Sequence, residues 1–172
     1  MADAEIAQSL KLLALDVDGI LTDGRIYYGN NGEELKSFNI KDGLGIKLLQ
    51  QGGVDIALIT GRSSDIVARR ARELGINDVI QGREDKLTAL KSLCQDKGIT
   101  LAECAYMGDD LPDLAAVRAA GLGLTVSDAA LPVRNAADWI SELAGGQGAV
   151  RQACEMILTL RGTLDSLQAD FD

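Results

Sequence analysis

Two aspartates stand at the end of an apolar run near the start of the chain. Residues 11–17 are predicted as a buried parallel strand, along which Asp16 and Asp18 project to the same side. Gly19 then permits a sharp turn. Two close carboxylates repel each other unless a positive charge lies between them, and Mg²⁺ prefers such oxygen ligands. The alternative to a metal site is a solvated turn after a strand, and the two aspartates alone do not decide between them.

Three further groups of polar residues follow later apolar runs. Thr60 and Gly61 precede a predicted helix, where a hydroxyl and an amide can bind phosphate oxygens. Lys86 offers a positive charge, and Asp109 adds a third carboxylate. Each also has an ordinary explanation: a helix cap, a solvent-facing lysine or a Gly-Asp turn. Their combination and order favour one site for phosphoryl chemistry.

The predicted reaction is the hydrolysis of a phosphate ester. Asp16 is the candidate nucleophile, which would form an aspartyl phosphate. Asp18 would protonate the leaving alcohol and then activate water. Thr60 and Lys86 complete the catalytic set, and Asp16, Asp18 and Asp109 form the candidate magnesium site.

Strands and helices are predicted to alternate along the chain. The strands are expected at residues 11–17, 54–59, 78–80, 104–107, 123–126 and 138–140, with helices between them at about 42–52, 64–74, 84–97, 114–120, 129–136 and 149–161. Asp42 is the expected cap of the first of these helices. This alternation indicates an α/β fold, a doubly wound parallel sheet with helices on both faces. Ligands bind such sheets at the carboxyl ends of the strands, where the polar residues fall.

One insertion and one tail interrupt this pattern within the single domain expected for residues 1–172. Turn residues between two strand-like runs predict a β-hairpin at about 25–38, too small to act as a cap domain. Two strands alone are marginal in water, so the apolar residues of this hairpin are expected to be covered by a partner. Residues 1–10 are predicted as a short lead-in with helical character, and residues 162–172 as a polar, flexible tail.

Composition excludes several classes of function. The chain has 172 residues, no histidine and a net charge of −9, which argues against nucleic acid or an anionic membrane as partner and excludes histidine-based catalysis. The three cysteines form no CxxC motif and are interpreted as reduced structural thiols. The N-terminus lacks a signal-peptide pattern and no apolar run is long enough to span a bilayer, so we expect a cytoplasmic protein.

The order of these motifs resembles the haloacid dehalogenase superfamily of phosphatases, which has a Rossmann-like fold. The motifs are residues 16–19, 60–62, Lys86 and 108–113. Residues 18–24, 38–43, 81–86 and 145–151 make the chain similar to one family within it, the phosphatases of 3-deoxy-D-manno-octulosonate 8-phosphate, over about residues 10–160. The resemblance implies Mg²⁺ on Asp16, the Asp18 carbonyl and Asp109, no cap domain, a homotetramer built through the hairpin, and a role in lipopolysaccharide precursor synthesis.

The substrate contacts come mainly from the same resemblance. The candidates are Asp18, Asn39, Ile40, Lys41, Asp42, Gly43, Lys47, Thr60, Gly61, Arg62, Arg70, Lys86 and Arg151. Lys41 and Lys47 stand where the family often has arginine, which keeps the charge but loses the fork geometry. The glycine-rich residues 145–148, followed by Arg151, are expected to fold over a site, that of a neighbour in the tetramer. The alternative is that these glycines merely link the last strand to the last helix.

Three other functions remain open. One is a phosphatase for another nonulosonate phosphate, such as a 9-phosphate. A phospho-receiver domain also combines aspartates, threonine, lysine and Mg²⁺, but its lysine comes last, whereas Lys86 precedes Asp109. A non-catalytic interaction module is disfavoured by the intact motifs.

Overall fold

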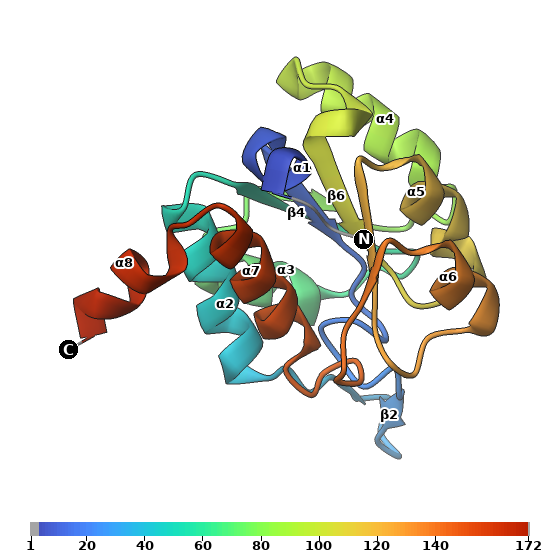
Figure 1. Cartoon of the computed structure of the whole chain (residues 1–172). Helices are drawn as coiled ribbons and strands as arrows, with labels where there is room; N and C mark the ends of the chain where they lie inside the picture. The colour runs from blue at the N-terminus through green and yellow to red at the C-terminus, as the bar shows by residue number, and fades with distance from the viewer. Residues whose placement is uncertain (1–3, 172) are drawn as a thin grey trace.

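Residues 4–171 are described in the computed structural model of the protein. Within them, six parallel strands form one sheet in the order β5-β4-β1-β6-β7-β8 (Figure 1). The strands are β1 (Leu12–Leu15), β4 (Asp55–Ile59), β5 (Asp78–Ile80), β6 (Cys104–Met107), β7 (Leu122–Thr125) and β8 (Trp139–Ile140). This sheet confirms the predicted doubly wound α/β fold. It also places β1 between β4 and β6, the strands that precede the other polar motifs.

Helices cover both faces of the sheet (Figure 1). On one face lie α2 (Ile40–Gln51), α3 (Asp65–Glu73) and α7 (Ala149–Leu160), with α1 (Ala4–Ser9) beside α7. On the other lie α4 (Lys86–Lys97), α5 (Leu114–Ala119) and α6 (Leu131–Ala136). Short 3-10 turns occupy Leu101–Glu103 and Leu111–Asp113. None of the helices in residues 4–171 is both long and apolar enough to cross a membrane.

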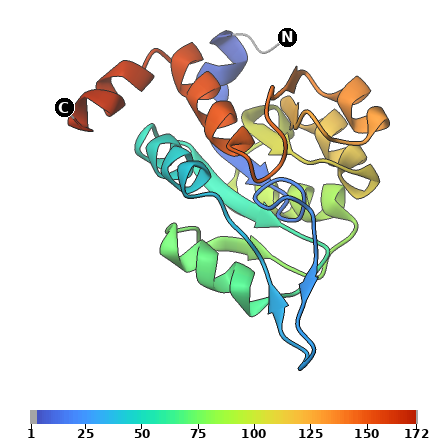
Figure 2. The same cartoon turned by 90° about the horizontal axis from the view of Figure 1, so that it is seen from below.

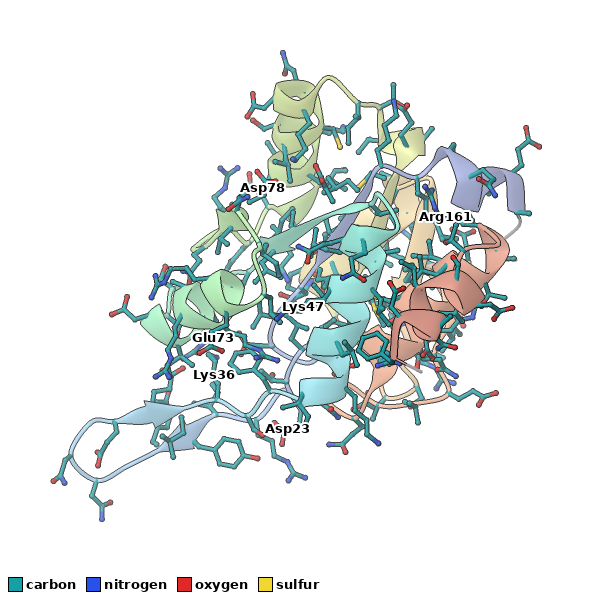
Figure 3. All side chains as sticks on the ribbon, turned by 90° about the vertical axis from the view of Figure 1, so that its left-hand side faces the viewer. Asp23, Lys36, Lys47, Glu73, Asp78 and Arg161 are labelled. Atoms are coloured by element: carbon teal, nitrogen blue, oxygen red, sulfur yellow. The ribbon has the colours of Figure 1, made fainter. Side chains whose placement is uncertain are left out.

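The predicted hairpin projects from this body (Figures 2 and 3). Its antiparallel strands β2 (Tyr27–Tyr28) and β3 (Glu34–Leu35) are only two residues each, and the Gly29 amide donates to the Glu33 carbonyl across the turn at 2.8 Å. Tyr28 and Leu35 are 70% and 63% exposed. The hairpin therefore presents apolar surface that the other residues of the range 4–171 leave exposed.

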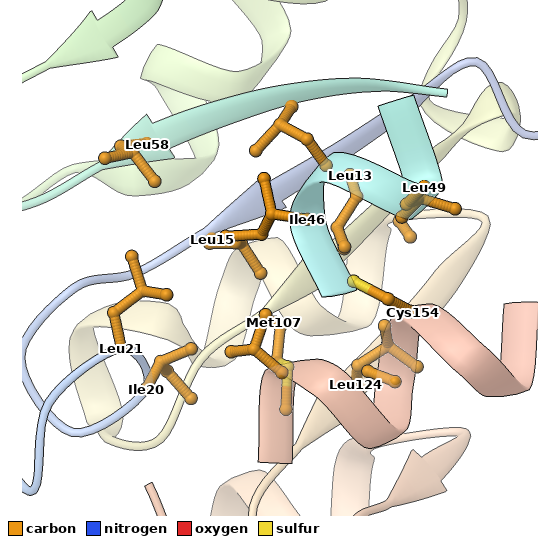
Figure 4. Packing of buried hydrophobic residues seen from close by; sticks show 14 of the residues in the cluster. Leu13, Leu15, Ile20, Leu21, Ile46, Leu49, Leu58, Met107, Leu124 and Cys154 are labelled. Atoms are coloured by element: carbon orange, nitrogen blue, oxygen red, sulfur yellow. The ribbon is translucent and has the colours of Figure 1, made fainter. Parts of the chain in front are cut away.

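The core forms two layers, one on each side of the sheet. Leu13 and Leu15 of β1 belong to the layer under α2 and α7 (Figure 4). Leu12 and Ala14 belong to the layer under α4. Because side chains alternate along a strand, a strand buried on both faces needs the continuous apolar run seen before Asp16. The three cysteines are free and buried in these layers, as expected for structural thiols.

Several local predictions differ from the structure, among them the start of α6, which is Leu131 rather than residue 129. Helix α2 is capped by Asn39, whose side chain accepts from the Lys41 amide at 2.9 Å, so Asp42 is not the cap but a buried residue of the first turn. Helix α4 begins at Lys86 rather than at residue 84. The tail is not loose throughout: α8 (Leu164–Gln168) and a 3-10 turn (Ala169–Phe171) form there, and Leu164 packs against the core. Residues 1–3 of the lead-in and residue 172 of the tail lie outside the described residues.

Candidate active site

The carboxyl ends of three neighbouring strands surround a cavity of about 300 Å³. Asp16 follows β1, Thr60 follows β4, and Asp109 follows β6. Lys86 enters the cavity from the first residue of α4. Parallel strands end at the same edge of a sheet, so the strand order brings these residues together although up to 93 positions separate them in the sequence.

A buried lysine lies between two buried carboxylates at the floor of this cavity. Lys86 Nζ is 2.8 Å from Asp16 Oδ1 and 2.7 Å from Asp113 Oδ1. All three residues are at most 5% exposed. A charge removed from water is tolerated only when it is paired, so this arrangement holds the Lys86 ammonium directly beside the candidate nucleophile.

The carboxylates of Asp16, Asp109 and Asp113 together carry more negative charge than the one lysine beside them neutralises. One oxygen of each lies within 4.8 Å of the others. Burial, and then the charge of Asp113, raises the pKa of Asp16 to about 7. Burial, and then the charge of Asp16, raises the pKa of Asp109 to about 8. A cluster of hard oxygen donors with uncompensated negative charge fits Mg²⁺.

Sequence reasoning gave Asp113 no role, although it closes the motif at residues 108–113. Besides its ion pair with Lys86, it accepts from the Tyr106 hydroxyl at 2.7 Å and from the amides of Asp109 and Asp110 at 3.0 and 3.2 Å. Asp113 thus holds both Lys86 and the loop that carries Asp109. The available signal was the presence of a third carboxylate in this motif, after Asp109 and Asp110.

Asp18 lies at the mouth of the cavity rather than in the carboxylate cluster. Its Oδ1 is 2.5 Å from Nζ of Lys36, which follows β3 in the hairpin. The predicted magnesium contact through the Asp18 carbonyl stays a prediction. Lys36 was not among the candidate site residues, because nothing in the local sequence relates a hairpin lysine to the end of β1.

The turn after β1 allows Asp109 to approach closely. Gly19 has φ +95°, and a Cβ built there would lie 2.1 Å from Asp109 Oδ2. Any side chain at this position would displace Asp109 and strain the backbone. Gly19 therefore serves the site through close packing as well as through the turn itself.

Thr60, Gly61 and Arg62 form the opposite side of the cavity. Thr60 is 1% exposed, and its Oγ1 accepts from the Arg62 amide at 3.4 Å. The Arg62 side chain is 42% exposed, and its Nη2 lies 3.2 Å from Glu34 Oε2 of the hairpin. Hydrogen bonding to Tyr28, and then the charge of Glu34, raises the pKa of Arg62. This partly exposed cation stands at the entrance of the cavity, beside Thr60 and Gly61.

The other predicted substrate contacts do not line this cavity within one chain. Ile40, Gly43, Lys47 and Arg70 line a separate groove of about 210 Å³ between α2 and α3. Arg70 also lies over the Phe38 ring at 5.8 Å. The Lys41 side chain is exposed on α2. Their contacts with substrate stay predictions.

Asp42, Asn39 and Arg151 join α2 to α7. The buried Asp42 Oδ1 accepts from the Arg151 amide at 2.8 Å, so it caps α7, and burial raises its pKa. Asn39 Nδ2 donates to the Gly146 carbonyl at 3.2 Å. The Arg151 side chain pairs with Glu155 at 2.7 Å. These contacts are intramolecular, and none of them reaches the cavity.

The glycine-rich residues 145–148 pack against the turn that carries Asp18. The Gly146 amide donates to the Ile20 carbonyl at 3.0 Å, and a Cβ at Gly145 would lie 1.8 Å from the Gly19 carbonyl oxygen. These glycines permit contact between two backbones, so they do more than link β8 to α7. Closure of a neighbouring site by this segment stays a prediction.

Several known proteins are similar to this chain in sequence and in fold. A family profile of haloacid dehalogenase-like hydrolases matches residues 71–152. The 3-deoxy-D-manno-octulosonate 8-phosphate phosphatase KdsC of Escherichia coli K12 is 44% identical over 159 residues, which are 92% of this chain and 85% of the relative.

Solved structures agree closely with the present one. The phosphatase of that name from Moraxella catarrhalis, in complex with magnesium, phosphate and KDO, is 51% identical with a TM-score of 0.96, covering 98% of this chain and 97% of that one. The cobalt-bound phosphatase from Haemophilus influenzae is 42% identical with a TM-score of 0.89, covering 92% and 93%.

Proposed function

The chain belongs to the haloacid dehalogenase-like hydrolases, within the 3-deoxy-D-manno-octulosonate 8-phosphate phosphatase family, and we propose that it hydrolyses this sugar-acid phosphate through an aspartyl-phosphate intermediate. It is a magnesium-dependent phosphatase. The observation that carries the proposed mechanism is the buried Asp16 carboxylate, 2.8 Å from Lys86 at the end of the central strand. The proposed reaction belongs to lipopolysaccharide precursor synthesis.

The reaction proceeds in two transfers. An Asp16 oxygen forms a bond to phosphorus as the bond between phosphorus and the ester oxygen breaks. The departing ester oxygen takes a proton from Asp18. Water then bonds to phosphorus while Asp18 accepts its proton, and the bond to Asp16 breaks to release phosphate. Lys86 stabilises the negative charge on Asp16 and on the phosphoryl oxygens throughout.

Asp16 and Asp109, with Asp113 beside them, are the side chains that would hold Mg²⁺. When bound, the ion supplies positive charge that offsets the carboxylates and the phosphoryl group. The chain's own groups supply orientation: Asp113 holds Lys86, and Gly19 leaves room for Asp109.

The substrate carries a phosphate at one end and a carboxylate at the other. Lys86 and the Thr60-Gly61 segment both line the cavity in which the phosphate would react, and the partly exposed Arg62 stands at its entrance. Arg70, with Lys47, lies in the separate groove and would complete the sugar-acid site from a neighbouring chain. Two separated groups of cations suit a substrate that has an anionic group at each end.

A phosphate-release screen with Mg²⁺ present tests this assignment. We expect a much higher kcat/KM for 3-deoxy-D-manno-octulosonate 8-phosphate than for hexose phosphates. The screen includes a nonulosonate 9-phosphate, since the same groups would accept a longer sugar acid. Equal activity on glucose 6-phosphate and the octulosonate phosphate would refute the assignment.

Arg62→Ala should mainly erode this preference. It removes a cation from the entrance but leaves the nucleophile and Lys86 in place, so kcat/KM for the octulosonate phosphate should fall roughly 10- to 100-fold. Activity on small phosphates should fall much less. Arg134→Ala, at an exposed arginine of α6, is the matched control. A uniform loss on all substrates would count against a role in specificity.

We also propose that the protein is a cytoplasmic homotetramer assembled through the hairpins. Support comes from Ile26, Tyr28 and Leu35, which are 45%, 70% and 63% exposed on the hairpin, and from the substrate groups that lie outside the cavity of a single chain. A cytoplasmic location agrees with the three free and buried cysteines, since disulfides are rare in that compartment.

Sedimentation at micromolar concentration checks the assembly. The wild type should sediment as a tetramer, and Leu35→Glu should shift it to smaller species because a charge enters the apolar contact. Leu131→Glu is the matched control, since Leu131 is 65% exposed on α6, away from the hairpin. A wild-type monomer would contradict the proposal.

A further inference from the structure

The hairpin carries a buried lysine into the active site of its own chain. Lys36 lies where the hairpin meets the body (Figure 3), and its side chain is 2% exposed. Its Nζ is 2.5 Å from Asp18 Oδ1 and 3.5 Å from Glu34 Oε1. Lysine is rarely buried to this extent unless its ammonium is paired.

The ion pair between Lys36 and Asp18 is part of a series of contacts in which positive and negative side chains alternate. Glu34, which contacts Lys36, also binds Arg62 through its other carboxylate oxygen at 3.2 Å. Asp18 therefore connects to Arg62 through Lys36 and Glu34. Lys86 is engaged by Asp16 and Asp113, so it is Lys36 that supplies a lysine contact to the Asp18 carboxylate.

Asp18 needs such a tether because it is the less buried of the two catalytic carboxylates. Its side chain is 23% exposed, against 7% for Asp16. A partly exposed carboxylate can rotate into solvent, and a displacement of about 1 Å of a catalytic group costs on the order of 10²-fold in rate. The buried Lys36 ammonium donates a hydrogen bond to one Asp18 oxygen and so removes that freedom, whether or not the other oxygen carries a proton.

We propose that Lys36 is a positioning residue for Asp18, holding its carboxylate where the leaving alcohol receives its proton. This inference rests on the proposed function, in which Asp18 is the general acid. It gives the hairpin a role in catalysis within the chain, in addition to any role in assembly.

The leaving group separates this role from a merely structural one. An alcohol must be protonated as it leaves, whereas p-nitrophenolate leaves without a proton. The parameter kcat/KM covers steps up to departure of the leaving group, so it isolates the step in which Asp18 acts as an acid.

The experiment compares Lys36→Met, Lys36→Arg and Lys91→Met as full-length proteins with Mg²⁺ on both kinds of substrate. Lys36→Met should lower kcat/KM for the octulosonate phosphate by roughly 30- to 100-fold, but change it less than about 3-fold for p-nitrophenyl phosphate. Lys36→Arg, which retains the positive charge, should restore most of the loss. Lys91→Met, at an exposed lysine of α4, should behave as wild type.

Either of two outcomes would overturn the inference: equal losses on both substrates, which indicate a structural role, or no loss on either. Sedimentation of each variant shows whether the assembly is retained. If the wild type fails to hydrolyse the octulosonate phosphate, the substrate assignment fails separately. The same comparison is then made with the best alcohol phosphate of the screen, and it tests Lys36 by the same criteria.

Discussion

Replacement of Asp16 by asparagine should lower kcat by about 10³-fold or more, which corresponds to at least ~4 kcal/mol of lost transition-state stabilisation. The amide has nearly the shape of the carboxylate but lacks the anionic oxygen that attacks phosphorus. Lys86 would keep its second partner, Asp113, at 2.7 Å, so the floor of the cavity should remain in place.

Phosphate release at saturating substrate and Mg²⁺ measures this loss. Folding can be checked by thermal denaturation in EDTA. Burial and the charge of Asp113 raise the pKa of Asp16 to about 7, so its ionised form destabilises the folded protein at pH 8. The asparagine variant should therefore be at least as stable as wild type there. Asp96→Asn, at an exposed aspartate of α4, is the control, and near-normal turnover by Asp16→Asn would refute the nucleophilic mechanism.

Removal of Mg²⁺ should abolish phosphate release, and restoring the ion should recover it. The carboxylates of Asp16, Asp109 and Asp113 approach within 4.8 Å, and a single lysine at 2.8 Å from Asp16 leaves net negative charge where an anionic phosphate must enter. Without the cation, the cavity floor repels its substrate as well as lacking charge stabilisation.

Thermal stability provides a readout that does not depend on turnover. Mg²⁺ should raise the Tm of the wild type, since an ion that binds only the folded state stabilises it. Asp109→Asn should weaken this dependence, because it removes one donor of the cluster. Asp128→Asn is a control outside the carboxylate cluster. Full activity after chelation and dialysis into metal-free buffer would contradict the assignment of the site.

The general architecture could be predicted because it depends on local patterns. The continuous apolar run before Asp16 indicated a strand buried on both faces, and the structure places Leu13 and Leu12 in opposite core layers. Parallel strands end at the same edge of a sheet. The polar residues that follow three of the apolar runs could therefore be expected to lie close together. Asp16, Thr60 and Asp109 do line the same cavity.

Local patterns were less informative where a polar residue had several possible partners. Asp42 had the residue type and position of a helix cap, but Asn39 caps α2 and Asp42 caps α7 instead. The glycines at residues 145–148 left two interpretations, a segment that folds over a neighbouring site or a simple link between β8 and α7. Only the packed structure shows that Gly145 is in contact with the backbone of Gly19.

The sequence by itself determined the order of strands and helices along the chain and the residues at the strand ends. It also determined the chemistry that the oxygens and cations of these residues favour. Tertiary structure alone decided the ion pairs that complete the site. Lys86 meets Asp113 across 27 positions, and Lys36 meets Asp18 across 18. Hydrophobic periodicity reports which face of an element is buried, but an ion pair depends on the distance and direction between two elements after they pack. For that reason the partners of Asp113 and of Lys36 could be placed only in the folded molecule.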